Sequence, residues 1–380
     1  MKRLIALMLF VAVSCSGATT IFMESGTDAT QDFTFYSSTS GTVTSDSSAP
    51  ITGTRSILLN TSSPATLAFA NSPAATMADA GRRITFRCKF DTIPAADAVI
   101  FQVRNASSNN VLQLGVNSTA NLKLLNTGVI SVTGTTVLRV NTVYRVAFSY
   151  IITSASVWTV NVFLNGKLEI TQNSGTLTNT TGTNFRLTVA AAAGANVKFW
   201  FDDVFLDNGT DLADPGNIIV TNKRPNANGA ANGFTTQIGA GGSGYGTGHS
   251  PQVNEQPLST TNGWSIASAS ALTEQYTIEG AATGDVDVSR RDYSLVDYMG
   301  WIDAKTASAG TRNIVLAGVA TNITTTTSFA LYTKVAGSTT YPSTNTAIGM
   351  NNNSVNNLTS LAECGILLAY KLPRRISITP

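Results

Sequence analysis

Residues 157–170, VWTVNVFLNGKLEI, decide the fold class of this 380-residue chain. One face of the stretch is apolar at every second position, at Trp158, Val160, Val162 and Leu164. Alternation with a period of two is typical of a β-strand whose one side is buried. The following Asn165-Gly166 pair accepts the positive φ angles of a tight type I′ turn. The stretch therefore predicts a β-hairpin.

The same pattern extends over residues 19–208, which read as short apolar runs bounded by Asn, Gly, Ser, Thr or Pro. Before the hairpin, the alternating residues are Tyr144, Val146, Phe148 and Tyr150. In ITFRCKF they are Ile84, Phe86, Cys88 and Phe90, which predicts that Cys88 is buried as a small hydrophobic residue. Regular short strands separated by turn residues indicate a β-sandwich.

The length and the change in composition along the chain predict two domains. A chain of 380 residues is too long for one ordinary domain. Charged residues make up 12%, which favours an all-β protein with polar turns. We expect a short strand and a Gly/Asn-rich linker or long loop over residues 215–257, a C-terminal β domain over 258–372 and a basic tail over 373–380. Cys364 alternates with Ile366, Leu368 and Tyr370 and is expected to be buried.

The order of YRVAFSY, VWTVNVFLNGKLEI and FWFDDVFLDNG resembles the late strands of laminin-G-like or concanavalin-like jelly rolls. The resemblance implies a concanavalin-like β-sandwich, or jelly roll, over residues 19–214, followed by a second, smaller β-sandwich domain. It is specific for fold and not for function, because this fold occurs in lectins, glycosidases, adhesins and inert spacers.

The run DDVFLDNG…PGNIIVTNKRPNANG, followed by STTNGW and AECGILLAYKL, is similar to a group of tailed-bacteriophage virion proteins. This resemblance implies a non-catalytic structural or adhesive virion protein, associated with the tail or capsid and located in the virion or outside the cell. The sandwich would face outward and contact host surface glycans. The C-terminal part would bind other virion proteins or further copies of this chain. Residues 1–18 depart from the pattern, because a virion protein assembled in the cytoplasm needs no export signal.

Residues 1–18 read as a signal-like or leading segment, with two positive charges before an apolar run too short to span a bilayer. Cys15 follows AVS, a weak bacterial lipobox, and is the lipidation candidate. Cleavage after Ala18 and retention of the segment are the alternatives. Lipidation would make the chain an exported bacterial surface lipoprotein or adhesin with a lectin-like domain, and only then would a membrane be a partner.

Charge and residue types argue against nucleic-acid binding and against the usual catalytic sets. The net charge is +2 and the basic residues are scattered, which excludes a nucleic-acid footprint. The only histidine, His249, has no acidic neighbour in the sequence, and no E-x-D-x-E triplet of a concanavalin-like glycosidase is present. We expect no catalytic residues and no enzymatic activity; a glycan-active enzyme with an unrecognised site is the weaker alternative.

Two low-specificity binding sites remain. Tyr245, within GAGGSGYGTG, and His249 are binding candidates in a glycine-rich loop that fails the context of a phosphate-binding loop. Asp207, Asp211 and Asp214 are calcium candidates, since DNGTDLAD offers carboxylates and carbonyls; no other cofactor is expected. Their alternative is a polar exit turn between domains.

The strand before this turn, which contains Asp202 and Asp203, is also expected to place alternate residues on opposite faces. Val197, Phe199, Phe201 and Asp203 are expected on one strand face. Lys198, Trp200, Asp202 and Val204 are expected on the other.

Overall fold

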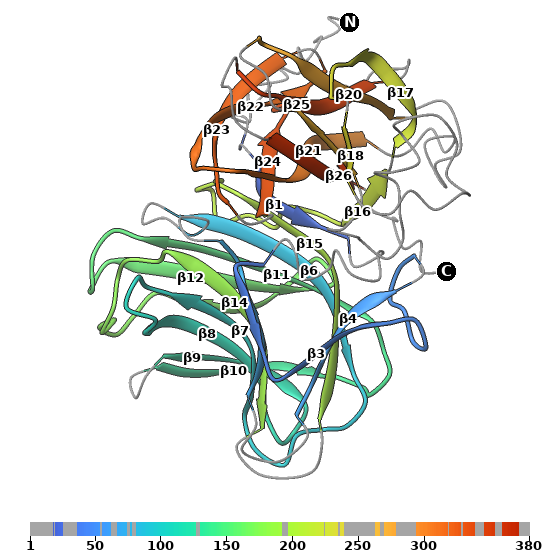
Figure 1. The fold of residues 1–380 in the computed structure, drawn as a ribbon. Helices are drawn as coiled ribbons and strands as arrows, with labels where there is room; N and C mark the ends of the chain where they lie inside the picture. The colour runs from blue at the N-terminus through green and yellow to red at the C-terminus, as the bar shows by residue number, and fades with distance from the viewer. Residues whose placement is uncertain are drawn as a thin grey trace, which may run out of the picture.

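In the computed structural model, every regular secondary-structure element among the described residues is a β-strand (Figure 1). The structure describes residues 18, 20–25, 36–53, 55–61, 67–73, 77, 81–126, 130–191, 197–223, 225–234, 236–238, 263–266, 270–278, 294–317, 319–327, 330–338, 346–353 and 359–371. The strands pair in antiparallel fashion in both parts of the described chain, for example β11 (Tyr144–Ile152) with β6 (Arg82–Phe90) and β21 (Ser294–Thr306) with β26 (Thr359–Lys371). No helix in the described ranges is long and apolar enough to cross a membrane.

The first unit is a sandwich of two sheets. Sheet A has eight strands, ordered β13 (Lys167–Gln172), β12 (Trp158–Leu164), β11 (Tyr144–Ile152), β6 (Arg82–Phe90), β15 (Lys198–Asp207), β4 (Ser56–Asn60) and β3 (Thr42–Asp46), with β1 (Thr20–Glu24) paired to β15. Sheet B has seven, ordered β10 (Ile130–Val137), β9 (Asn121–Asn126), β8 (Asn110–Val116), β7 (Ala98–Arg104), β14 (Asn184–Ala191), β5 (Ala68–Asn71) and β2 (Ser38–Ser40).

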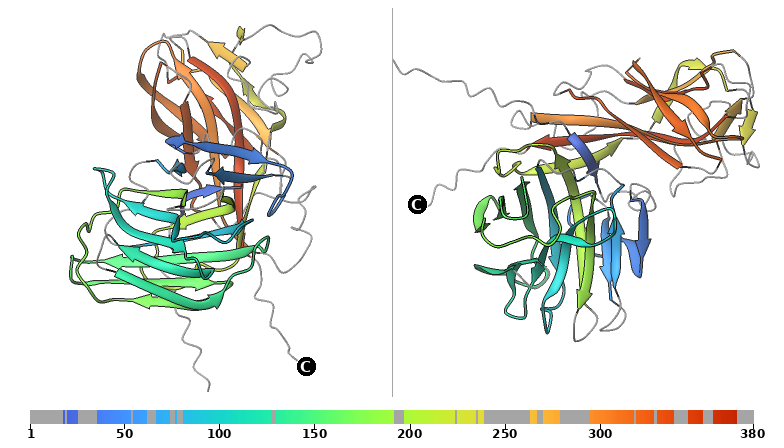
Figure 2. Two further views of the ribbon diagram at one scale, coloured as in Figure 1. Left: turned by 90° about the horizontal axis from the view of Figure 1, so that it is seen from below. Right: turned by 90° about the vertical axis from the view of Figure 1, so that its left-hand side faces the viewer.

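The second unit consists of two smaller sheets. Sheet C has six strands, ordered β18 (Thr236–Ile238), β19 (Gly263–Ile266), β26 (Thr359–Lys371), β21 (Ser294–Thr306) and β24 (Ala330–Val335), with β16 (Ile218–Lys223) paired to β26. Sheet D has five, ordered β17 (Pro225–Asn232), β20 (Thr273–Ile278), β25 (Thr346–Asn351), β22 (Gly310–Leu316) and β23 (Val319–Thr325). In the right-hand view of Figure 2, the strands of this unit run across those of the first.

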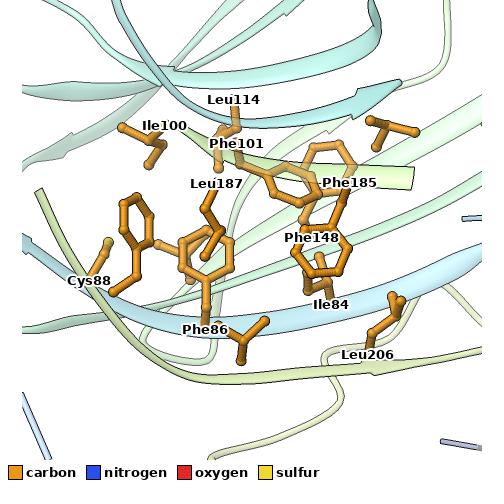
Figure 3. Packing of buried hydrophobic residues seen from close by; sticks show 14 of the residues in the cluster. Ile84, Phe86, Cys88, Ile100, Phe101, Leu114, Phe148, Phe185, Leu187 and Leu206 are labelled. Atoms are coloured by element: carbon orange, nitrogen blue, oxygen red, sulfur yellow. The ribbon is translucent and has the colours of Figure 1, made fainter. Parts of the chain in front are cut away.

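The core of the first unit lies between sheets A and B, as the alternation predicts. Phe86 of β6 and Phe148 of β11 both pack on Phe101 of β7, with ring centroids 5.9 and 5.0 Å apart (Figure 3). Cys88 is buried in the same layer, as predicted, and Cys364 is buried in the second unit. The predicted all-β class with a concanavalin-like jelly roll is confirmed.

The hairpin at residues 157–170 forms as β12 and β13, with positive φ at both turn residues, 51° for Asn165 and 88° for Gly166. A register shift between Val162 and Phe163 adds a bulge near the turn. Because Gly lacks a Cβ atom, it adopts this left-handed conformation without strain.

The short strand predicted at the start of the region 215–257 is present as β16. Residues after it, which were expected to form a linker or long loop, contribute β17 to sheet D and β18 to sheet C; residues 224, 235 and 239–257 lie outside the described part. β16 lies along the edge of β26, where Ile218 pairs with Lys371 and Lys223 with Ile366. The apolar run of NIIVTNK thus forms the predicted strand, which pairs with β26 as far as Lys223.

One hydrophobic cluster continues from the first unit into the second. Its members in the second unit are Ile218, Val220, Met299, Trp301, Leu367 and Ala369. Trp301 is fully buried, and its indole N–H donates to Asn222 Oδ1 at 3.2 Å. We call the contact zone between sheet A and the second unit the seam.

Candidate functional site

Strand β15 carries a bulge at the Asp202-Asp203 pair. Asp202 lies opposite Arg87 of β6, whereas Phe205 lies opposite Thr85, so that β15 has one residue more than β6 in this interval. Asp203 has a φ of 52°, in the left-handed region that Asp tolerates better than most residues. The extra residue resets the alternation of the strand.

The predicted placement of Asp203 beside Phe199 and Phe201 is therefore wrong. Its Oδ2 lies 2.6 Å from Nε of Arg87, which belongs to the face of β6 opposite the core. Its Oδ1 accepts the N–H of Val220 in β16, at 2.8 Å. A period of two holds only while each residue of a strand has one partner, and the bulge breaks that condition.

Asp202 is held by the first unit. Its Oδ2 accepts the N–H of Thr52 at 3.0 Å and the hydroxyl of Ser56 at 2.9 Å. Asp202 is fully buried and Asp203 is 1% exposed, so neither carboxylate can meet a substrate. Asp203 thus joins the two units through Val220, whereas Asp202 is bonded within the first unit.

Burial dominates the electrostatics of this joint. It raises the pKa of Asp202 well above its ordinary value, and the neighbouring charge of Asp203 raises it further. Burial also raises the pKa of Asp203, which the charge of Arg87 and the N–H of Val220 oppose. The Arg87 guanidinium thus offsets part of the cost of ionising Asp203, and the ionised forms of both carboxylates are costly in a low-dielectric site.

The calcium candidates lie on arginine side chains of sheet A. Asp207 forms two hydrogen bonds with Arg83, each of 2.8 Å, and Asp211 accepts two from Nη1 of the same residue, at 2.7 and 2.8 Å. Asp214 accepts two hydrogen bonds of 2.6 Å from Arg145. Each carboxylate is engaged by a guanidinium, which forms planar two-point contacts with carboxylates.

No three His, Cys, Asp or Glu side chains in the described ranges converge where they could hold a metal ion. The structure thus brings Asp207 and Asp211 together on Arg83 and places Asp214 apart from them, on Arg145. Calcium binding at these residues stays a prediction to be tested by chelation.

The exit turn is bonded across the outer face of sheet A. Ser149 of β11 donates to the carbonyl of Ala213 at 2.7 Å, and Asn161 of β12 donates to that of Leu212 at 3.1 Å. Arg145 also donates to the carbonyl of Gly216 at 2.9 Å. These bonds fix the path of the chain from β15 to β16.

The other candidates lie outside the described residues. Tyr245 and His249 belong to residues 239–262, and Cys15 belongs to residues 1–17. Their roles as binding and lipidation candidates stay predictions.

The outer face of sheet B carries polar residues that the sequence reasoning missed. Across four neighbouring strands, Asn71, Arg186, Gln102 and Gln113 lie opposite one another in register. Arg104 follows two positions after Gln102 and therefore shares its face. A signal for this face is present in the sequence, because polar residues alternate with apolar ones in IFQVRN and NFRLTV.

Arg186 is held firmly on this face. Its Nε donates to Asn71 Oδ1 at 2.6 Å, and its guanidinium carbon lies 3.7 Å from the ring centroid of Phe69. Burial and the charge of Arg104 lower the pKa of Arg186 to about 10, and burial lowers that of Arg104. Neither arginine pairs with a carboxylate in the part of the chain that the structure describes.

Comparison with known proteins gives structural matches alone. No family model matches the sequence, and no curated protein matches it. An endo-β-1,4-glucuronan lyase from the fungus Trichoderma reesei is 12% identical, with a TM-score of 0.42, over 52% of this chain and 99% of its own. The alginate lyase of Aplysia kurodai is 11% identical, with a TM-score of 0.38, over 50% and 99%. The cellulose-induced protein Cip1 is 14% identical, with a TM-score of 0.36, over 46% and 88%. These likenesses concern the fold alone, and the chain has a concanavalin-like β-sandwich together with additional sheets.

Proposed function

We propose that this chain is a non-catalytic structural and adhesive protein, a tail- or capsid-associated component of a tailed phage, whose first sandwich contacts surface glycans. The observation that carries the proposal is the use of acidic residues at the seam. Asp203 accepts the N–H of Val220 across the seam, and the buried side chains of Asp202, Asp207 and Asp214 are bonded to Thr52, Arg83 and Arg145 of the first unit. Such groups position domains and are not free to transfer protons to a substrate.

The virion assignment is supported by the order of sequence motifs from about residue 20 to residue 370. Its test is mass spectrometry of purified phage particles, with a known capsid protein of the same phage as the internal control. We expect peptides of this chain in stoichiometric amounts. Their absence from intact particles would remove the assignment.

A second candidate, an exported bacterial surface lipoprotein or adhesin, is favoured by the charged and apolar start of the chain and by Cys15. Metabolic labelling with a palmitate analogue tests it in a bacterial host, with Cys15→Ser as the matched control. Incorporation that depends on Cys15 supports the lipoprotein. Equal labelling of the two proteins counts against it.

The absence of catalysis is tested directly with purified protein. We expect no soluble products from a panel of neutral and acidic polysaccharides, measured by reducing-end assay and by absorbance of unsaturated products. Products from any polysaccharide would overturn the non-catalytic part of the proposal and leave particle association to be judged by mass spectrometry.

A further inference from the structure

We infer that the outer face of sheet B, at Arg186, Arg104 and Gln102, binds an acidic sugar through its carboxylate and a neighbouring hydroxyl. The inference rests on the proposed glycan contact of the first sandwich and specifies where that contact lies and what chemical class it takes. In Figure 1, the strands of sheet B labelled β8, β9 and β10 lie on the far side of the first unit from the second unit. The face is thus distinct from the seam.

The arginines indicate an anion. Arg186 is 8% exposed, Arg104 is partly buried, and the two lie diagonally on adjacent strands, since Arg186 is opposite Gln102. Two neighbouring guanidinium groups repel each other, and burial without a counter-charge is costly. No ion pair in the described ranges compensates either charge. A carboxylate between them would supply the missing charge in the two-point geometry that guanidinium groups favour.

Gln102 indicates that the ligand also carries a hydrogen-bond donor. The residue is 8% exposed, and its Oε1 is buried without a hydrogen-bond partner. Asn110, opposite Arg104 in register, has a buried Oδ1 in the same condition. An unpaired buried acceptor is destabilising until a donor reaches it. Inorganic phosphate at neutral pH and free carboxylates offer mainly acceptors, whereas a sugar acid carries hydroxyl donors beside its carboxylate.

The site is also preorganised and of suitable size. Arg186 is fixed at Nε by Asn71 and stacked on Phe69, which leaves its terminal nitrogens for a ligand. Opposite residues on neighbouring strands are about 5 Å apart and diagonal ones about 7–8 Å. Arg186, Gln102 and Arg104 therefore span roughly one sugar ring.

The first experiment uses the wild-type full chain. Isothermal titration compares tetrasaccharides of polygalacturonate and polyglucuronate with their carboxyl-reduced counterparts, which have the same backbone and linkage. We expect reduction of the carboxylates to weaken binding roughly 10- to 100-fold, as loss of charge-assisted hydrogen bonds predicts. Equal binding of the reduced sugars would overturn the inference while leaving neutral glycan contact intact.

The second experiment assigns the residues. Arg186→Gln and Arg104→Gln should each weaken acidic-sugar binding at least about tenfold. Lys123→Gln, on β9 of the same sheet and separated from β7 by β8, is the matched loss of one positive charge, at a residue paired with Asp97, and should change the affinity little. Circular dichroism melting confirms that the variants are folded. Unchanged affinity in both folded arginine variants would overturn the site.

The third arm separates a sugar from a free anion. Gln102→Leu should weaken the tetrasaccharide and leave any binding of inorganic phosphate unchanged. Phosphate that binds wild type as tightly as the sugars would show a simple anion site and overturn the sugar assignment. Absence of binding to every acidic sugar would also overturn it, and the virion assignment would still be decided by particle mass spectrometry.

Discussion

Replacement of Arg87 by methionine should destabilise the seam more than replacement of both members of its ion pair. Arg87 lies 2.6 Å from Asp203, whose side chain is 1% exposed. Arg87→Met keeps the length of the side chain and removes its charge. The Asp203 carboxylate would then stay buried with the Val220 N–H as its remaining partner among those described above.

The magnitude follows from this burial. Removal of one partner of a buried ion pair costs about 3–5 kcal/mol, because it leaves an uncompensated charge. Asp203→Asn keeps an acceptor for Val220 and tolerates the positive φ of 52°, so its cost should be smaller, about 1–2 kcal/mol. The double variant has neither charge and should be at least about 1 kcal/mol more stable than Arg87→Met alone.

The assay is guanidinium chloride unfolding at pH 9, with calorimetry to resolve separate transitions of the two units. At that pH the Asp203 carboxyl, whose pKa burial raises to about 6, cannot offset the loss of Arg87 at low cost by taking up a proton. Arg139→Met, at an exposed position of the first unit, is the matched control and should change the free energy of unfolding by less than about 0.5 kcal/mol. The reasoning is refuted if Arg87→Met costs less than about 1 kcal/mol, or if the double variant costs the sum of the two single changes.

Three further predictions concern pH, backbone and metal. Burial raises the pKa of Asp303 to about 6, so the stability that its proton provides is full below about pH 4 and lost as pH rises through 6. Asp303→Asn should remove ~2–3 kcal/mol of that dependence, measured by unfolding between pH 4 and 7. Gly166→Ala should cost about 1 kcal/mol in the same assay, because φ is 88° and the new Cβ would lie 3.1 Å from Arg145 Nη2. Chelation of calcium should leave the melting temperature unchanged, because guanidinium groups engage Asp207, Asp211 and Asp214; a fall of several degrees would restore the calcium site.

The sequence predicts the elements of the first sandwich well because local rules control them. The β12–β13 hairpin depends on alternation and on Asn165-Gly166, which lie within one short stretch. The bulge at Asp203 depends on how β15 pairs with β6, more than a hundred residues earlier in the chain. No pattern within β15 reports that pairing, so simple alternation gives the wrong face of the strand from Asp203 onward.

The candidate sites were predicted less well, and for a related reason. Asp207, Asp211 and Asp214 are close in sequence, yet their partners Arg83 and Arg145 come from distant strands of sheet A. Nearness in sequence suggests one shared ion, whereas the fold supplies Arg83 for Asp207 and Asp211 and Arg145 for Asp214. The polar residues on the outer face of sheet B, Asn71, Arg186, Gln102 and Gln113, are far apart in sequence and adjacent only in the folded sheet. Nearness in sequence therefore cannot predict that they lie together.

The charged contact between Arg87 and Asp203 at the seam affects which surface of the first sandwich is left uncovered by the second unit. Replacing buried ion pairs by hydrophobic residues is often neutral or stabilising, so maximal stability does not explain the Arg87–Asp203 contact. Charged hydrogen bonds are directional, however, and Asp203 meets Arg87 and Val220 in one relative placement of the two units. An apolar contact alone would tolerate sliding of β16 over sheet A. The seam therefore fixes the second unit on the sheet A side, and strands β8, β9 and β10 of sheet B lie on the far side of the first unit from it (Figure 1).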